Sequence, residues 1–341
     1  MTVRVGINGF GRIGRNLFRA AKARNADIDF VAVNDLGDVE TMAHLLQFDS
    51  VLGKYPQPVK TSKNGIKVGD DVLEVLSVRN PAELPWGDLG VDLVVESTGI
   101  FTSKAKASTH LEAGAPLVIV SAPSDGADAT FVYGVNHKDF DPKQHKVVSN
   151  ASCTTNCFVP LVKVLDDAFG IEQGFMTTVH AYTGDQMLVD GPHKDLRRAR
   201  AAAINIVPTS TGAARATSLV LESMKGKLDG TSMRVPVATG SVTDFNAILS
   251  REASVDEINA AYAKAAKSGP LKGIVRYADE PLVSSDIVND PHSCIFDSLL
   301  TMSMGKLVKV LGWYDNEWGY SNRLVDIVTY TGSKLRGRKR S

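Results

Sequence analysis

The pattern of apolar positions predicts strands that alternate with helices over the first 150 residues. An apolar strand at 3–8 is followed by a helical stripe from Ile13 to Ala21, and then by a second strand at 30–34. A hairpin with Asn64-Gly65 as its turn is expected at 59–68. Further strands are expected at 72–76, 92–99, 117–123, 130–134 and 146–150, with a crossover helix over 103–114. This alternation predicts an α/β fold with a Rossmann-type, doubly wound parallel sheet.

The second half of the chain has a different pattern. An amphipathic helix is expected directly after Cys153, and a polar, basic stretch follows at 182–200. Ser254 and Glu257 form a capping box for a helix that ends near Lys267. Strands are expected at 174–181, 233–237, 241–249, 294–299 and 306–313; a tight polar loop at 209–212; a short helix from there to about 224; and a terminal helix at 316–330. These elements predict an α+β domain with a mostly antiparallel sheet.

Composition narrows the class of protein. The chain has 341 residues, with 38 basic and 38 acidic side chains, so no net charge favours nucleic acid or membrane as the main partner. No apolar run reaches membrane-spanning length, and the first strand leaves no room for a signal peptide. The three cysteines have no metal-binding spacing. We therefore expect a cytoplasmic protein without a metal, and a solvated basic tail at 334–341.

A glycine-rich turn after the first strand carries a dinucleotide fingerprint. Gly9, Gly11 and Gly14 give G-x-G-x-x-G between a strand and a helix, and Asp35 ends the next strand. The glycines allow a tight turn, close approach of the pyrophosphate, and close packing of helix on strand. Asp35 is placed to bind the adenosine ribose and to repel a 2′-phosphate, which favours NAD over NADP.

Cys153 is a candidate nucleophile, although a free cysteine is as often a small buried hydrophobe. It stands between a strand end and a predicted helix, where backbone N–H groups and the helix dipole favour a thiolate. A thiolate adds to an aldehyde, and loss of hydride from that adduct leaves a thioester. His180, on a predicted strand, is a candidate base for these steps, although a lone histidine is by default structural. Phosphate oxygens have candidate partners in Thr183, Arg198, Thr211, Gly212 and Arg234.

The chain resembles the phosphorylating glyceraldehyde-3-phosphate dehydrogenases over residues 2–332. The resemblance is carried by Ile7-Asn-Gly-Phe-Gly-Arg-Ile-Gly-Arg15, Ala151-Ser-Cys-Thr-Thr-Asn-Cys157, His180-Ala-Tyr-Thr183, Asp195-Leu-Arg-Arg-Ala-Arg-Ala-Ala202 and Tyr314-Asp-Asn-Glu-Trp-Gly-Tyr320. It implies reversible oxidation of glyceraldehyde 3-phosphate, with NAD and inorganic phosphate, to 1,3-bisphosphoglycerate. Cys153 matches the family's nucleophile, and His180 matches its base.

The resemblance also implies further site residues. Substrate or phosphate positions are matched by Ser152, Thr154, Thr183, Arg198, Thr211, Gly212 and Arg234. Cofactor positions are matched by Arg12, Ile13, Asp35, Arg79, Ser121 and Asn316, beside the Gly9 and Gly11 of the fingerprint.

Family members are homotetramers in which a loop matching 181–203 packs across subunits. The resemblance implies an NAD-binding domain at 1–152 completed by a helix at 316–333, and a catalytic domain at 153–315. One departure concerns Gly191, because NAD-specific members usually carry a bulky apolar residue there. We expect NAD preference with a stringency that Gly191 reduces.

Two rival readings stay open at the level of sequence. Erythrose-4-phosphate dehydrogenases share the cysteine signature but hydrolyse the thioester, and they lack the His-Ala-Tyr-Thr and Ser-Thr-Gly forms found at 180–183 and 210–212. A non-catalytic binding or redox-sensing protein would use Cys153 and the basic tail, and would show negligible turnover.

Overall fold

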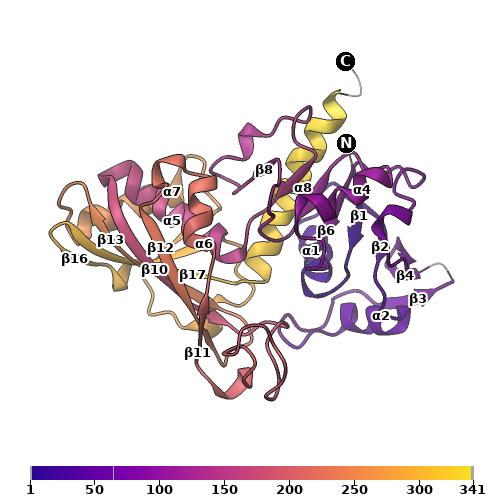
Figure 1. The fold of residues 1–341 in the computed structure, drawn as a ribbon, viewed down its shortest axis with the longest axis horizontal. Helices are drawn as coiled ribbons and strands as arrows, with labels where there is room; N and C mark the ends of the chain where they lie inside the picture. The colour runs from indigo at the N-terminus through magenta and orange to yellow at the C-terminus, as the bar shows by residue number, and fades with distance from the viewer. Residues whose placement is uncertain (1, 64, 339–341) are drawn as a thin grey trace. The chain divides into compact units, whose positions relative to one another are not determined.

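The computed structural model describes residues 2–63 and 65–338, which form two compact units. The first unit contains the chain up to Phe131, His137–Ala151, and the chain from Ser321 onwards. The second contains Val132–Asn136 and Ser152–Tyr320. Figure 1 shows both units, with many of their elements labelled. No helix among the described residues is long and apolar enough to span a bilayer.

The first unit is built on a sheet with the strand order β3-β4-β5-β2-β1-β6-β7-β9-β8. The strands are β1 (Val3–Asn8), β2 (Ile28–Asn34), β3 (Val59–Ser62), β4 (Gly65–Val68), β5 (Asp71–Leu76), β6 (Leu93–Glu96), β7 (Val118–Val120), β8 (Ala129–Thr130) and β9 (Val147–Ser149). Pairing is parallel from β5 to β8, and antiparallel only in the β3-β4-β5 extension. The predicted Rossmann-type parallel sheet is confirmed. Asn64 of the predicted hairpin turn lies outside the described residues.

Several predicted elements of this unit are wrong in extent, and the strands expected at 92–99 and 117–123 are only β6 and β7. The helix expected over 103–114 is two short helices that meet at Ser108, whose hydroxyl and N–H both donate to the Lys104 carbonyl at 2.8 Å. The strand expected at 130–134 leaves the sheet after Thr130, and Val132 instead donates its N–H to the Asn136 side chain. The helices of this unit are α1 (Arg12–Ala23), α2 (Val39–Gln47), α3 (Lys104–Ala107), α4 (Thr109–Glu112) and most of α8 (Trp318–Arg338).

The predicted basic tail is partly helix. Because α8 continues to Arg338, residues 334–338 are helical, and residues 339–341 lie outside the described part of the chain. Arg336 Nε donates to Asp92 Oδ2 at 2.6 Å, and Asp92 is only 3% exposed. Arg336 is therefore anchored on the first unit, and the prediction of a fully solvated tail is wrong at this residue.

The second unit has a sheet with the order β11-β12-β10-β13-β17-β15-β14, and β16 pairs with β17. Its strands are β10 (Ile171–Ala181), β11 (Val207–Ser210), β12 (Leu228–Val235), β13 (Ser241–Leu249), β14 (Val275–Ala278), β15 (Cys294–Asp297), β16 (Met302–Met304) and β17 (Leu307–Tyr314). Only β10-β12 and β14-β15 pair in parallel among the described strands here, so the mostly antiparallel sheet is confirmed. The polar loop expected at 209–212 is wrong for its first two residues, which pair with β12 as part of β11. The helix expected to reach 224 is only α6 (Ala213–Ala216), followed by 3-10 turns.

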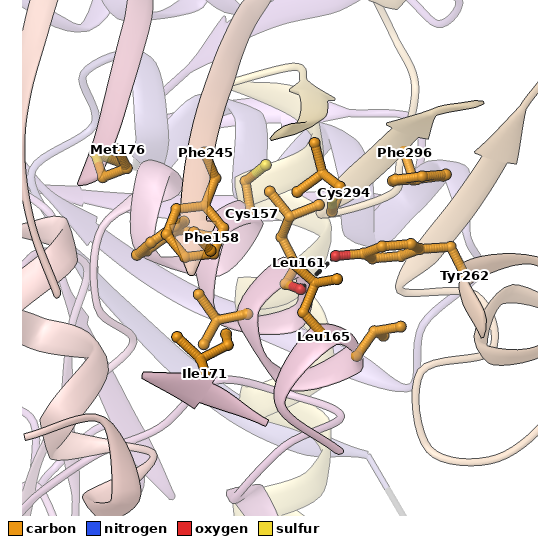
Figure 2. Close-up of a cluster of buried hydrophobic side chains, with 14 of the residues drawn as sticks. Cys157, Phe158, Leu161, Leu165, Ile171, Met176, Phe245, Tyr262, Cys294 and Phe296 are labelled. Atoms are coloured by element: carbon orange, nitrogen blue, oxygen red, sulfur yellow. Dashed lines mark hydrogen bonds between the residues drawn. The ribbon is translucent and has the colours of Figure 1, made fainter. Parts of the chain in front are cut away.

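A buried apolar cluster fixes helix α5 (Cys153–Phe169) in the second unit (Figure 2). Phe158 meets Phe245 of β13 edge-on, with ring centroids 4.9 Å apart. Tyr262 of α7 (Val255–Lys267) stacks on Phe296 at 3.8 Å and donates its hydroxyl to the Leu161 carbonyl at 2.6 Å. Aromatic packing and this buried hydrogen bond hold α5 against β13, β15 and α7. They therefore fix the position of its first residue, Cys153.

Candidate active site

Cys153 is the first residue of α5, as the sequence pattern predicts. Ser152 caps the helix by accepting a 3.0 Å hydrogen bond from the Thr155 N–H. Ala151, just before it, has φ +56°, a left-handed conformation that a non-glycine residue adopts at a cost. This sharp turn brings the chain from β9 into α5 and leaves Cys153 partly exposed.

The predicted base lies beside the predicted nucleophile. His180, on β10 and 4% exposed, has its Nε2 3.4 Å from Cys153 Sγ. Its Nδ1 lies 2.7 Å from the Ala181 carbonyl oxygen, which can only accept, so we place the proton of the neutral ring on Nδ1. Nε2 then presents its lone pair to the Cys153 thiol.

Burial opposes a charge on either member of this pair. It raises the pKa of Cys153, against the smaller lowering effects of the Arg234 charge and of hydrogen bonds at Thr154. It also lowers the pKa of His180 to about 4, with Arg234 adding to the shift. Desolvation therefore opposes the thiolate that the helix N-terminus favours. A protonated His180 3.4 Å away would stabilise that thiolate.

Two arginines and a threonine gather next to the pair. Arg234 of β12 stands directly opposite His180 in the sheet and donates to the Thr183 hydroxyl at 2.8 Å. Arg198 Nη1 lies 2.6 Å from Asp185 Oδ2, and Thr183 donates to the other oxygen of the same carboxylate. Burial alone would raise the pKa of Asp185, but the Thr183 hydrogen bond and both arginine charges lower it overall. This cluster concentrates positive charge and donors suited to an anion.

Other predicted phosphate-site residues have partners within the protein. The Thr154 hydroxyl lies 2.9 Å from the Tyr314 hydroxyl and is buried. Thr211 Oγ1 accepts from the Ala213 N–H at 3.2 Å, and Gly212 precedes α6. Thr154 therefore turns its hydroxyl into the core, whereas Thr211 and Gly212 lie at an accessible loop.

The glycine fingerprint forms its turn in the first unit. Gly9 has φ +92°, and a Cβ there would lie 2.6 Å from the Thr98 nitrogen. A Cβ on Gly14 would lie 2.3 Å from the Gly9 carbonyl oxygen, so close packing of helix on strand requires glycine. Gly11 has open space where its Cβ would be. The residues fit a dinucleotide, because the backbone is bare where a pyrophosphate would approach.

A cavity of about 370 Å³ adjoins this turn, and most of the predicted cofactor residues of the first unit line it. They include Gly9, Gly11, Asp35 and Arg79. Asp35 also accepts hydrogen bonds from the N–H groups of Phe10 (2.7 Å) and Gly37 (3.0 Å), so it shapes the glycine turn as well as facing the cavity.

The remaining predicted cofactor residues do not line that cavity. Arg12, the first residue of α1, forms an ion pair with Asp49, and Ile13 follows it. Ser121 follows β7, and its N–H donates to the Glu96 carbonyl at 2.9 Å. Asn316, in the second unit, accepts from the Ser241 hydroxyl at 2.9 Å.

Several residues of the site were not predicted from the sequence. Asp185 is a carboxylate among cations, and its place two residues after Thr183 was the available signal. Tyr314 joins the hydroxyls of Thr154 and Thr178, at 2.9 and 2.8 Å, and so links the first turn of α5 to the strand that carries His180. No local pattern marks this link, because 160 residues separate Thr154 from Tyr314.

Two models of known protein families match segments of this chain, one mainly in each unit. Residues 3–104 match the family model described as glyceraldehyde 3-phosphate dehydrogenase, NAD binding domain. Residues 152–316 match glyceraldehyde 3-phosphate dehydrogenase, C-terminal domain.

Curated relatives match over nearly the whole chain. Glyceraldehyde-3-phosphate dehydrogenase 2 of Streptomyces arenae is 62% identical over 335 residues, covering 98% of this chain and 100% of the relative. The Streptomyces coelicolor enzyme is 61% identical over 336 residues with the same coverage. The Mycobacterium bovis enzyme is 63% identical over 341 residues, also with the same coverage.

Proposed function

The chain belongs to the glyceraldehyde-3-phosphate dehydrogenase family, and from that premise we propose how its residues carry out the family's reaction. The protein is an NAD-dependent oxidoreductase that converts glyceraldehyde 3-phosphate and inorganic phosphate to 1,3-bisphosphoglycerate, reversibly. The observation that supports the catalytic assignment is the 3.4 Å approach of Cys153 Sγ to His180 Nε2. The erythrose-4-phosphate alternative is not favoured, because the close relatives carry the other name.

His180 and Cys153 act as base and nucleophile. His180 Nε2 takes the thiol proton as Sγ attacks the aldehyde carbon and gives it to the aldehyde oxygen, so a hemithioacetal forms and His180 is neutral again. His180 then removes the hydroxyl proton of this adduct as the hydride leaves. NAD, when bound, supplies the hydride acceptor. The resulting thioester is attacked by phosphate, and Cys153 leaves as thiolate and regains its proton from His180.

The polar residues near the pair bind the two phosphates. Arg234 and Thr183 hold one anion, and Arg198 with Thr211 and Gly212 holds the other, by charge-assisted and backbone hydrogen bonds. Asp185 is paired with Arg198 and partly offsets the charge of the two arginines before an anion binds. Ser152 and Thr154 set the first turn of α5 around Cys153, and Thr154 does so through Tyr314.

The first unit holds most of the cofactor residues that the family resemblance implies. Asp35 would bind the cofactor's adenosine ribose, and Gly9 and Gly11 at the start of α1 would hold its pyrophosphate. Arg12, Ile13, Arg79 and Ser121 complete the cofactor residues of the first unit, and Asn316 matches a further cofactor position of the family. Asp35 makes NAD the preferred cofactor, although a Cβ on Gly191 would lie 3.3 Å from Met187 Sδ and its absence loosens that loop. Steady-state kinetics with equal efficiency for NAD and NADP would contradict this preference.

We propose that 1–152, completed by a helix at 316–333, serves the cofactor and that 153–315 serves catalysis. The compact units differ from these bounds, because Val132–Asn136, Ser152 and residues 316–320 belong to the second unit. The enzyme works as a homotetramer in the cytoplasm. Large exposed apolar side chains in and just after the loop at 181–203 support subunit contacts there. They are Leu188, Val189, Leu196, Ile204 and Ile206, each at least 69% exposed.

The test measures NADH formation from glyceraldehyde 3-phosphate, with and without phosphate, for wild type and Cys153→Ser. We expect turnover that depends on phosphate and that the substitution abolishes. Cys294→Ala is the matched control, because Cys294 is fully buried and takes no part in the reaction. Turnover at the same rate with and without phosphate would indicate a hydrolysing aldehyde dehydrogenase. It would also contradict the assignment of a second phosphate site.

A further inference from the structure

A buried carboxylate that none of the roles above uses is bonded to the lining of the cofactor cavity. Glu96 ends β6 and is 1% exposed. Its Oε1 accepts hydrogen bonds from the N–H and the hydroxyl of Thr98. Its Oε2 accepts from Asn8 Nδ2 at 2.6 Å and from His110 Nε2 at 3.0 Å. Four donors thus surround one carboxylate, which satisfies its buried charge.

The second partner of His110 determines its tautomer. Trp86 Nε1, which can only donate, lies 3.0 Å from His110 Nδ1. Nδ1 must accept this bond, so the neutral ring carries its proton on Nε2 and donates it to Glu96. His110 Nε2 and Asn8 Nδ2 lie 3.4 Å apart because both donate to the same oxygen. His110 is 0% exposed, so water does not replace either partner.

The network continues to two more strand ends. Asn8, at the end of β1, accepts from Asn34 Nδ2 at 2.7 Å. Asn34, at the end of β2, accepts from the Val78 N–H at 2.8 Å and donates to the Val78 carbonyl at 2.9 Å. Asn8, Asn34, Val78 and Thr98 all line the cavity beside the glycine turn. One carboxylate therefore connects the walls supplied by β1, β2 and β6.

We propose that Glu96, oriented by the fixed tautomer of His110, is the positioning residue that shapes this cavity for the dinucleotide. It touches no reacting atom and acts by holding Asn8 and Thr98 in place. The proposal rests on the proposed function for the identity of the ligand. The proposal also goes beyond the proposed function, because it predicts that a neutral amide at position 96 cannot take over the role of Glu96. In Glu96→Gln, the side-chain NH2 group would face the Thr98 N–H in one orientation of the amide. In the other orientation it would face the N–H groups of Asn8 and His110, so a donor would face a donor in either case.

The experiment compares full-length wild type and Glu96→Gln by NAD titration and by steady-state kinetics. We expect the Kd and KM for NAD to rise about tenfold, the scale of one buried donor left unpaired. The KM for glyceraldehyde 3-phosphate and the kcat at saturating NAD should change less than about twofold, since binding is lost equally in ground and transition states. A role in folding alone would not produce this separation of KM from kcat.

Asp92→Asn is the matched control. Asp92 lies just before β6, whereas Glu96 lies at its end. Like Glu96, Asp92 is buried (3% exposed), and it accepts hydrogen bonds from the Arg4 N–H and from Arg336. Its substitution should lower the melting temperature without raising the KM for NAD. An equal rise in that KM for Asp92→Asn and Glu96→Gln would overturn the proposal, as would an unchanged KM in Glu96→Gln.

A second variant tests the tautomer. Trp86→Phe removes the donor to Nδ1, so His110 can move its proton to Nδ1 and accept from an amide at position 96. The double variant Trp86→Phe/Glu96→Gln should therefore bind NAD more tightly than Glu96→Gln alone. If the fold increases in the Kd for NAD of the two single variants simply multiply in the double variant, the role given to His110 is overturned. Wild type that binds NAD but turns over no aldehyde would overturn the proposed function, while the titration would still decide this proposal.

Discussion

At the scale of single residues, the reactivity of Cys153 depends on its partner more than on its place in a helix. Burial raises the pKa of the Cys153 thiol and lowers that of His180 to about 4. Each charge alone is disfavoured, so the thiolate and the imidazolium have to form together. The helix N-terminus contributes, but it does not decide the protonation state.

His180→Asn tests this dependence. We expect turnover to fall at least about 100-fold, the scale of general-base catalysis, and alkylation of Cys153 by iodoacetamide at pH 7 to slow markedly. The label reports on Cys153, because Cys157 and Cys294 are fully buried. His44→Asn, at an exposed histidine, should behave like wild type. An unchanged alkylation rate in His180→Asn would show that Cys153 is activated without its neighbour.

Residue types within short motifs could be predicted, whereas contacts between distant residues could not. Cys153 and His180 stand in motifs, and the structure brings them together. Tyr314 was not predicted, because its link to Thr154 spans 160 residues and depends on where β17 meets α5. The bond from His110 to Glu96 spans 14 residues and likewise has no periodic signature.

At the scale of elements, predictions succeeded where the signal was local. The capping box of α7 is present with both of its hydrogen bonds, since Ser254 and Glu257 lie within one turn. The single helix predicted at 103–114 divides at Ser108, whose hydroxyl adds a second bond to the Lys104 carbonyl. Strands β14 and β16 were not predicted. In β14 the two buried residues, Val275 and Ala278, do not alternate with exposed ones, and β16 has no buried residue.

A substitution at Asp128, next to β8, tests how much the hydrogen bonds of this carboxylate contribute to stability. It accepts bonds from Lys104 at 2.5 Å and from the N–H groups of Lys146 and Val147 at 2.8 Å. Burial would raise the pKa of Asp128, but these bonds lower it below the ordinary 3.8. The unfolded chain therefore binds more protons near that pH. The stability that Asp128 contributes is present above about pH 4 and is lost as pH falls through the folded pKa.

Asp128→Asn should thus lower the free energy of unfolding by roughly 1–2 kcal/mol at pH 7. The difference from wild type should shrink toward pH 3, where the native carboxylate also becomes protonated. Thermal melts at the two pH values measure it. Asp88→Asn, at an exposed site, should change neither melt. A difference from wild type that stays the same at both pH values would rule out the charge as its source.

At the scale of the whole molecule, the fold class was readable from the order of patterns. Alternating strands and helices predicted the parallel sheet, and the later run of strands predicted the antiparallel one. The unit boundaries needed the structure. Val132–Asn136 belongs to the second unit although the chain on both sides of it belongs to the first, and composition does not change there.

Assembly is tested by Leu196→Glu. Leu196 is 82% exposed, and a charge in a subunit contact cannot be buried without a partner. Light scattering should give the mass of four chains for wild type and of a smaller species for the variant. Val72→Glu, at a residue that is 51% exposed in the first unit, should keep the mass of wild type. A wild type with the mass of one chain would contradict the tetramer.

The first unit has a consequence for synthesis on the ribosome, because it contains both ends of the chain. About 170 residues of the second unit separate Ala151 from Ser321, and at about 5–20 residues per second they take roughly 10–35 s to translate. During that interval the nascent cofactor sheet lacks α8, and with it the Arg336 partner of Asp92. A nascent chain of this kind exposes apolar surface for many seconds, which makes it a substrate for chaperones that bind at the exit tunnel.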